Sequence, residues 1–200
     1  STFIGGAGSD YCTGIVVEEG FVYITGYTAS SNFPMMNAYD STFGGSQDCF
    51  VTKIASDGQS LEYSTYIGDS ESDQSLSIGV FDGCAYITGV TASSAFPTVN
   101  AYDFTYNGGV DCFVTKLAAD GQSLNYSTFL GGSVTDSGRS IAIENGYVYV
   151  TGVACPNFPV VNAYDSTHNG GSECFVTKFA IDGQSLIYST FLGGSLVDIP

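Results

Sequence analysis

The chain is built from short stretches in which apolar and polar side chains alternate. In residues 21–26, Val22 and Ile24 face one side of an extended backbone and Tyr23 and Thr25 face the other, which is typical of a β-strand. A Gly-containing pair precedes this stretch, and Gly supplies the positive φ that tight hairpin turns need. The pattern occurs three times and predicts three hairpins. Their first strands are 15–18, 78–81 and 141–144, their turns Glu19-Gly20, Asp82-Gly83 and Asn145-Gly146, and their second strands 21–26, 84–89 and 147–152.

A seven-residue stretch, Asp48–Ile54, shows that these hairpins belong to a repeat. Its pattern of an acid followed by Cys-Phe-Val-Thr-Lys returns about every 63 residues, at Asp111–Leu117 and Glu173–Phe179. An Asp-Gly turn follows each copy and predicts a fourth strand. The fourth strands are expected at Leu61–Ile67, Leu124–Leu130 and Leu186–Leu192.

A longer segment between the second and third strands carries Phe-Pro and then Asn-Ala-Tyr-Asp. We call it the excursion, residues 33–47, 96–110 and 158–172. Proline has no N–H to donate, so it is excluded from the middle of a sheet. We therefore expect the excursions to run over the surface, with one helical turn at the Tyr-Asp pair.

Four antiparallel strands in a repeat of this length indicate a β-propeller blade. The sequence predicts an all-β fold of three such blades, about 63 residues each, whose ring is incomplete within one chain. Blade 1 is expected at 13–75, blade 2 at 76–138 and blade 3 at 139–200, after an opening segment at 1–12 with the sequence of a last strand. A stacked β-solenoid is the alternative, although its coils are usually shorter and need no hairpins.

The motifs S-T-[FY]-[IL]-G, Y-[IV]-T-G, F-P, C-F-V-T-K and D-G-x-S-L-x-Y-S-T together cover essentially the whole chain. In this combination the chain resembles the SBBP-type β-propeller repeat of large secreted and surface proteins of bacteria and archaea. The resemblance implies propeller blades and an extracellular or cell-surface location, and it implies no defined activity. The chain departs from the family at the Cys of the third strand, where a small apolar residue is more usual.

Three blades do not close a ring, because complete propellers have typically four to eight. An open edge strand invites pairing with another chain, and the two end segments, 1–11 and 189–200, are copies of one element. We therefore expect self-association by β-augmentation, into a ring or an open filament or sheath. The alternative is a fragment of a longer propeller. The start at Ser1, without Met and within a repeat, indicates a processed or trimmed product.

The charge balance excludes several partners. The chain has 20 acidic and 4 basic side chains, for a formal net charge of −16. Nucleic-acid binding needs a basic face, and attachment to anionic lipid needs basic residues, so neither is expected. No apolar run approaches the roughly 18 residues of a membrane span. The acidity indicates solubility, with divalent-cation binding or a salty habitat as alternatives.

Six cysteines, an even number, suit the oxidising setting of a secreted protein. None has the spacing of a zinc site. Cys155 and Cys174 are expected at the same rim of their blade, so they are the first expected disulfide. The pairing of the other four stays open, and some could join two chains; buried free thiols are the alternative. These four are Cys12, Cys49, Cys84 and Cys112.

Two sets of acids recur with the repeat. Asp10, Asp73 and Asp136 are expected in the turn before each first strand, where Asp usually accepts backbone hydrogen bonds. Calcium needs about six to eight oxygen ligands and no D-x-D-x-D-G loop is present, so these three are weak calcium candidates, and no other cofactor is expected. The second set begins each third strand and consists of Asp48, Asp111 and Glu173. The lysine of each third strand is expected to pair with one of the recurring acids. These lysines are Lys53, Lys116 and Lys178.

The sequence contains no catalytic constellation. His168 is the single histidine, no G-x-S-x-G surrounds a serine, and nothing selects a carboxylate pair among the acids. We therefore expect an extracellular structural protein, not an enzyme, whose main partner is itself. The alternatives are a module that binds glycans or surface proteins through the excursions and, less favoured, a polysaccharide hydrolase.

Overall fold

The computed structural model describes residues 2–196 and 198. All regular secondary structure within these residues is β-strand. Twelve strands form three four-stranded antiparallel sheets, each in sequence order. Blade 1 contains β1 (Asp10–Glu18), β2 (Phe21–Thr28), β3 (Asp48–Ile54) and β4 (Leu61–Ile67). Blade 2 contains β5 (Asp73–Phe81), β6 (Cys84–Thr91), β7 (Asp111–Leu117) and β8 (Leu124–Leu130). Blade 3 contains β9 (Ser137–Glu144), β10 (Tyr147–Ala154), β11 (Glu173–Phe179) and β12 (Leu186–Leu192).

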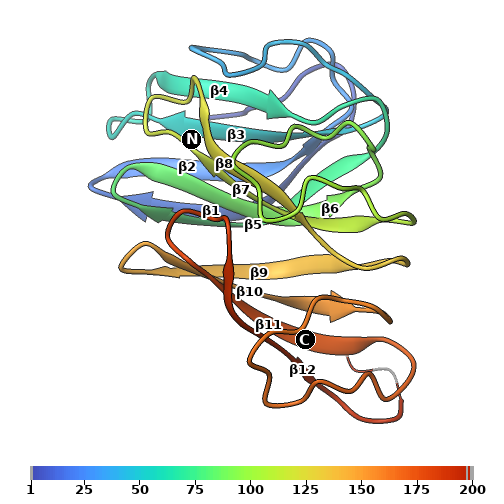
Figure 1. The fold of residues 1–200 in the computed structure, drawn as a ribbon. Helices are drawn as coiled ribbons and strands as arrows, with labels where there is room; N and C mark the ends of the chain where they lie inside the picture. The colour runs from blue at the N-terminus through green and yellow to red at the C-terminus, as the bar shows by residue number, and fades with distance from the viewer. Residues whose placement is uncertain (1, 197, 199–200) are drawn as a thin grey trace.

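The three sheets follow one another, with blade 1 and blade 3 at opposite ends and blade 2 between them (Figure 1). Strand β5 contacts both β1 and β9, so the first strands of the blades lie side by side, as the inner strands of a propeller do. No sheet among the described residues closes into a barrel. The predicted all-β fold of open propeller blades is confirmed.

The third and fourth strands match the prediction residue for residue, whereas the first strands are longer than expected. Strand β1 begins at Asp10 instead of residue 15, and it continues past a bulge between Cys12 and Gly14. Gly26 allows this close pairing, because a Cβ there would overlap the carbonyl oxygen of Tyr11. Strands β5 and β9 are longer in the same way, so the sheets begin before the expected blade limits of 13, 76 and 139.

The three predicted hairpins are confirmed. Both central residues of each turn have positive φ, for example 50° at Glu19 and 85° at Gly20. This is the type I′ geometry, whose twist matches that of the flanking strands.

The excursions cover the outer edge of each sheet. In blade 1 the N–H of Met36 donates to the carbonyl of Ser64 at 3.1 Å, the N–H of Ser64 donates back at 2.7 Å, and Tyr66 N–H donates to Asp40 O. The expected helical turn at Tyr39 and Asp40 is wrong, because the backbone groups there bond to β4. The outer strand edge is therefore occupied.

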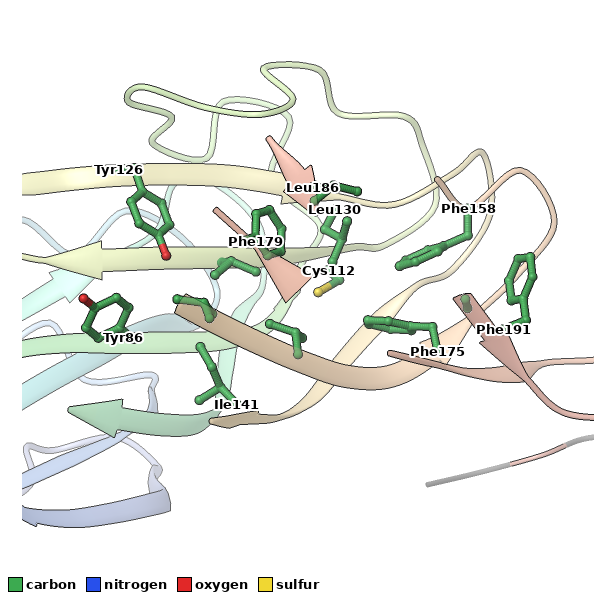
Figure 2. Close-up of a cluster of buried hydrophobic side chains, with 14 residues drawn as sticks. Tyr86, Cys112, Tyr126, Leu130, Ile141, Phe158, Phe175, Phe179, Leu186 and Phe191 are labelled. Carbon is green, nitrogen blue, oxygen red and sulfur yellow. The ribbon is translucent and has the colours of Figure 1, made fainter. Parts of the chain in front are cut away.

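The cores lie between the blades. Figure 2 shows the seam between blades 2 and 3, where Cys112 and Leu130 of blade 2 lie alongside Phe158 and Phe175 of blade 3. A second cluster joins blades 1 and 2 through the counterparts of these residues. They are Cys49 and Ile67 of blade 1 and Phe96 and Phe113 of blade 2.

Candidate functional site

The side of blade 1 that faces away from blade 2 leaves apolar side chains exposed. Ile15 on β1 is 66% exposed, whereas its counterparts Ile78 and Ile141 are only 6% and 7% exposed because the preceding blade covers them. Val17 is exposed beside Ile15. We call this surface the N-face. It consists of Ile15, Val17, Val22, Ile24 and Ile54, which the strand register places on one side of the sheet.

The opposite end of the molecule has the complementary surface. Leu192 is 46% exposed, whereas its counterparts Ile67 and Leu130 are completely buried against the following blade. We call this surface the C-face, and its other members are also more exposed than their counterparts in blades 1 and 2. It consists of Cys174, Val176, Tyr188 and Leu192. The apolar surfaces left open at the two ends of the described structure are thus sheet faces. The expected association through open strand edges stays a prediction.

The two recurring sets of acids meet at the junctions between blades. A Cβ on Gly68 would stand 2.9 Å from Asp73 Oδ2 and 3.0 Å from Asp48 Oδ1, so both carboxyl groups contact this glycine. Both residues are buried, and Oδ1 of each has no hydrogen-bond partner. Asp111 and Asp136 form the same arrangement around Gly131 at the next junction.

Burial makes these carboxyl groups hold their protons more tightly. It raises the pKa of Asp48 to about 6, although the N–H of Gly44 donates to this carboxyl at 2.8 Å, and the charge of Asp73 raises that pKa further. Burial raises the pKa of Asp111 to about 6 in the same way, and it also raises the pKa of Asp73 and Asp136.

Asp10 is a contrasting case, because within the described residues no acid of a preceding blade lies beside it. Burial acts to raise its pKa, but hydrogen bonds from the Thr28 hydroxyl, the Gly6 N–H and the Ser30 hydroxyl outweigh this and lower the pKa. The sequence analysis missed these hydroxyls, although a Thr-Ala-Ser motif at the end of the second strand occurs in blades 1 and 2.

The calcium candidates occupy a different place from the expected turn. Asp10 and Asp73 are the first residues of β1 and β5, and Asp136 immediately precedes β9. Their carboxylates accept hydrogen bonds from the chain, as when the N–H of Gly132 and of Cys155 donate to Asp136. Within residues 2–196 and 198, no group of three or more His, Cys, Asp or Glu side chains is arranged to hold a metal ion. The calcium site stays a prediction.

All six cysteines are free thiols in the structure, including Cys155 and Cys174. Cys155 lies next to Ser172, with Sγ and Oγ 3.9 Å apart, while Cys174 is opposite Val153 on β10. The two cysteines of the expected disulfide are therefore diagonal neighbours, a less suitable arrangement than a directly opposed pair.

The remaining cysteines differ in exposure. Cys49 and Cys112 are completely buried between blades, Cys84 is half-buried, and Cys12 is exposed on β1. Burial raises the pKa of the Cys112 thiol to about 12, which keeps it protonated and unreactive.

The lysines of the third strands were expected to pair with the recurring acids, but they lie over aromatic rings instead. Lys53 Nζ is 4.4 Å from the centroid of the Phe21 ring, and Lys178 Nζ is 4.3 Å from that of Tyr147. In each third strand the lysine comes five residues after the acid, so the extended backbone keeps the two side chains apart. The lysines therefore act through cation–π contacts.

Known families give an independent check on these blades. Residues 1–34 match the SBBP family model, a beta-propeller repeat. The match spans the opening segment, the first hairpin and the first Phe-Pro pair, and it confirms the resemblance that the repeated motifs indicated. No curated protein matches the chain. Among the described residues, no helix is long and apolar enough to cross a membrane.

Outside the part that matches the SBBP model, a groove of about 440 Å³ lies between the blade 2 excursion and blade 3. The Tyr102 ring at this seam packs edge-on against Phe179 of β11, with centroids 6.3 Å apart. An aromatic ring, a carboxylate and amides are groups that suit a polar ligand such as a sugar. The lining residues are Tyr102, Asp103, Asn107, Gly131, Gly132, Ser133, Asn157 and Pro159.

Proposed function

We propose that this chain is an extracellular structural protein whose copies join head to tail, with the C-face of one copy against the N-face of the next. One observation carries this proposal: the residues of the two faces are the counterparts of those that already pack blade on blade within the chain. Leu192 is 46% exposed where Leu130 is completely buried, and Ile15 is exposed where Ile78 is buried.

The contact has a physical driving force and a direction. Burying an exposed Ile, Val or Leu side chain contributes about 1.5–3 kcal/mol. Such exposed side chains are Ile15 and Val17 on the N-face and Leu192 on the C-face. Because the two faces differ, the contact is heterologous, so it closes into a ring or continues as a filament. The family resemblance supports an extracellular setting, and the net charge of −16 keeps the subunits soluble.

The proposal is tested by placing a charge on one face at a time. We expect the unmodified chain to form particles larger than a monomer in light scattering and electron microscopy. Ile15→Asp on the N-face and Leu192→Asp on the C-face should each give monomers, since a buried unpaired charge opposes the contact. Phe104→Asp is the matched control, because Phe104 is an exposed apolar residue of the blade 2 excursion and belongs to neither face.

A mixing experiment distinguishes head-to-tail joining from other modes. The Ile15→Asp chain keeps an intact C-face and the Leu192→Asp chain keeps an intact N-face, so an equimolar mixture should form one-to-one dimers and nothing larger. A chain that is monomeric at high concentration, or single variants that assemble like the unmodified chain, would overturn the proposal.

A second candidate function, binding of glycans, is favoured by the groove at the seam of blades 2 and 3. Its polar lining and the Tyr102 ring suit a sugar. A glycan array with the unmodified chain and an Asn107→Ala variant checks this. A ligand whose signal survives the substitution would exclude the groove as its site.

A further inference from the structure

Three aromatic rings of blade 1 stay buried although they lie next to the N-face. Phe33, Phe50 and Tyr66 form a small cluster in which the rings of Phe33 and Phe50 are stacked with centroids 4.5 Å apart. Ile4, from the opening segment, packs against this cluster. A side chain from outside the blade therefore contributes to the cover over these rings.

The same aromatic site occurs in the other two blades, where the preceding blade covers it. Leu130 at the end of β8 lies in one cluster with Phe158, Phe175 and Phe191 of blade 3, as Figure 2 shows. Ile67 at the end of β4 takes this role for blade 2. In the repeated motif S-T-[FY]-[IL]-G, Ile4, Ile67, Leu130 and Leu192 are the same position. Ile4 thus occupies the place of a residue from a preceding blade.

The opening segment holds this place weakly. Residues 2–4 belong to no strand, and Phe3 is fully exposed, whereas its counterparts Tyr66, Phe129 and Phe191 are buried. Further along, the N–H groups of Gly6, Ala7 and Gly8 are each bonded to a side chain of blade 1. Ile4 can therefore leave the aromatic rings while the residues after it remain attached to blade 1.

Leu192 is better placed than Ile4 to fill such a site. It ends β12, a strand paired with β11 along its length, and it lies opposite Cys174 within the C-face. It is a firmly anchored side chain whose counterparts in blades 1 and 2 are already inserted into the next aromatic site.

We propose that the site formed by Phe33, Phe50 and Tyr66 is the acceptor for Leu192 of a second copy, and that Ile4 is a placeholder that this leucine displaces. The inference rests on the proposed head-to-tail assembly and adds its entry point. Ile4 shields the aromatic rings in the free subunit, and it competes with the incoming strand end.

The test uses two neighbouring substitutions in the full chain. Ile4→Ser removes the competing side chain, so the dissociation constant for association, measured by sedimentation velocity, should fall about tenfold. Phe3→Ser changes a side chain that makes no such contact and should leave the constant unchanged. The double variant Ile4→Ser/Leu192→Asp should be monomeric, which separates entry of Leu192 from non-specific stickiness. Far-UV circular dichroism confirms that each variant is folded.

The outcomes separate this inference from the proposed function. Association that is weakened or unchanged by Ile4→Ser would overturn the placeholder while head-to-tail assembly stands. Tighter association that survives Leu192→Asp would overturn Leu192 as the displacing residue. If neither the unmodified chain nor Ile4→Ser associates at all, the proposed function itself fails.

Discussion

The buried carboxyl pair at the first junction makes stability depend on pH, and Asp48→Asn tests this. The substitution keeps the shape of the side chain. Its amide oxygen can still accept from the N–H of Gly44, and its NH₂ group can donate towards Asp73, whose carboxyl group lies at the same glycine, Gly68.

The magnitude follows from the pKa of Asp48, which is 3.8 in an unfolded chain and about 6 in the fold. Below pH 3.8 both states are neutral and the full stability is present. Between pH 3.8 and about 6, Asp48 is ionised in the unfolded chain but still protonated in the fold, so the free energy of unfolding falls as the pH rises. Above about pH 6 Asp48 is ionised in both states, and the loss of stability is complete. The loss is about 1–3 kcal/mol, with the lower value applying if nearby solvent screens the charge. Asp48→Asn should therefore raise stability at pH 7 by this amount and have little effect at pH 4.

The assay is urea unfolding at pH 4, 5, 6 and 7, followed by circular dichroism. The quantity compared is the difference in unfolding free energy between variant and unmodified chain, since other titrating groups cancel in it. At pH 7 the melting temperature should rise by about 2–10 °C. Asp57→Asn is the matched control, because Asp57 lies in an exposed turn where it accepts only from the N–H of Gln59.

Two results would refute this reasoning. One is a difference that does not vary with pH. The other is an Asp48→Asn variant that is less stable at pH 7 together with an unmodified chain that loses stability when a chelator is added. That pair of findings would mean that the carboxylates hold a divalent cation in ionised form.

Three further predictions concern the packing of the blades. Gly26→Ala should lower the unfolding free energy by about 3 kcal/mol or more, because its Cβ would overlap the carbonyl oxygen of Tyr11; chemical denaturation measures this. In a thiol-labelling experiment on the folded chain, exposed Cys12 should react first and buried Cys112 only after unfolding, and equal rates would contradict the seam between blades. Tyr66→Phe should cost about 1–2 kcal/mol, since the hydroxyl donates to a backbone carbonyl at 2.6 Å and accepts from a backbone N–H.

The strand content could be predicted because its signals are local. The motif D-G-x-S-L-x-Y-S-T holds both the Asp-Gly turn and most of the fourth strand within one short window, so the limits of Leu61–Ile67 came out correctly. The start of β1 could not be found in this way, because it depends on Gly26, a residue on the neighbouring strand whose missing side chain lets Asp10 and Tyr11 join the sheet. The excursions were missed as edge covers for a related reason: their partners lie on β4, well away in sequence.

The candidate site was harder to predict than the fold. The repeat shows that Ile15 and Ile78 are the same position, but only the arrangement of the blades shows that one is covered and the other is not. Asp48 and Asp73 were recognised as two separate sets of acids, and their meeting beside Gly68 needs the return of β4 to the rim where β3 begins. The expected disulfide depends on the register of β10 and β11, which places Ser172 directly beside Cys155 and Cys174 diagonal to it. That disulfide stays a prediction.

The cover over the outer strands restricts the geometry of growth. Met36 and Ser64 exchange two backbone hydrogen bonds in blade 1, and the pairs Val99–Ser127 and Val161–Ser189 repeat this in blades 2 and 3. With these donors and acceptors satisfied inside the subunit, the outer strands offer neighbouring particles little backbone template for lateral fusion. Accretion through the sheet faces alone is one-dimensional, so concentrated material should give separate threads or rings, and should not coalesce into cross-β bundles.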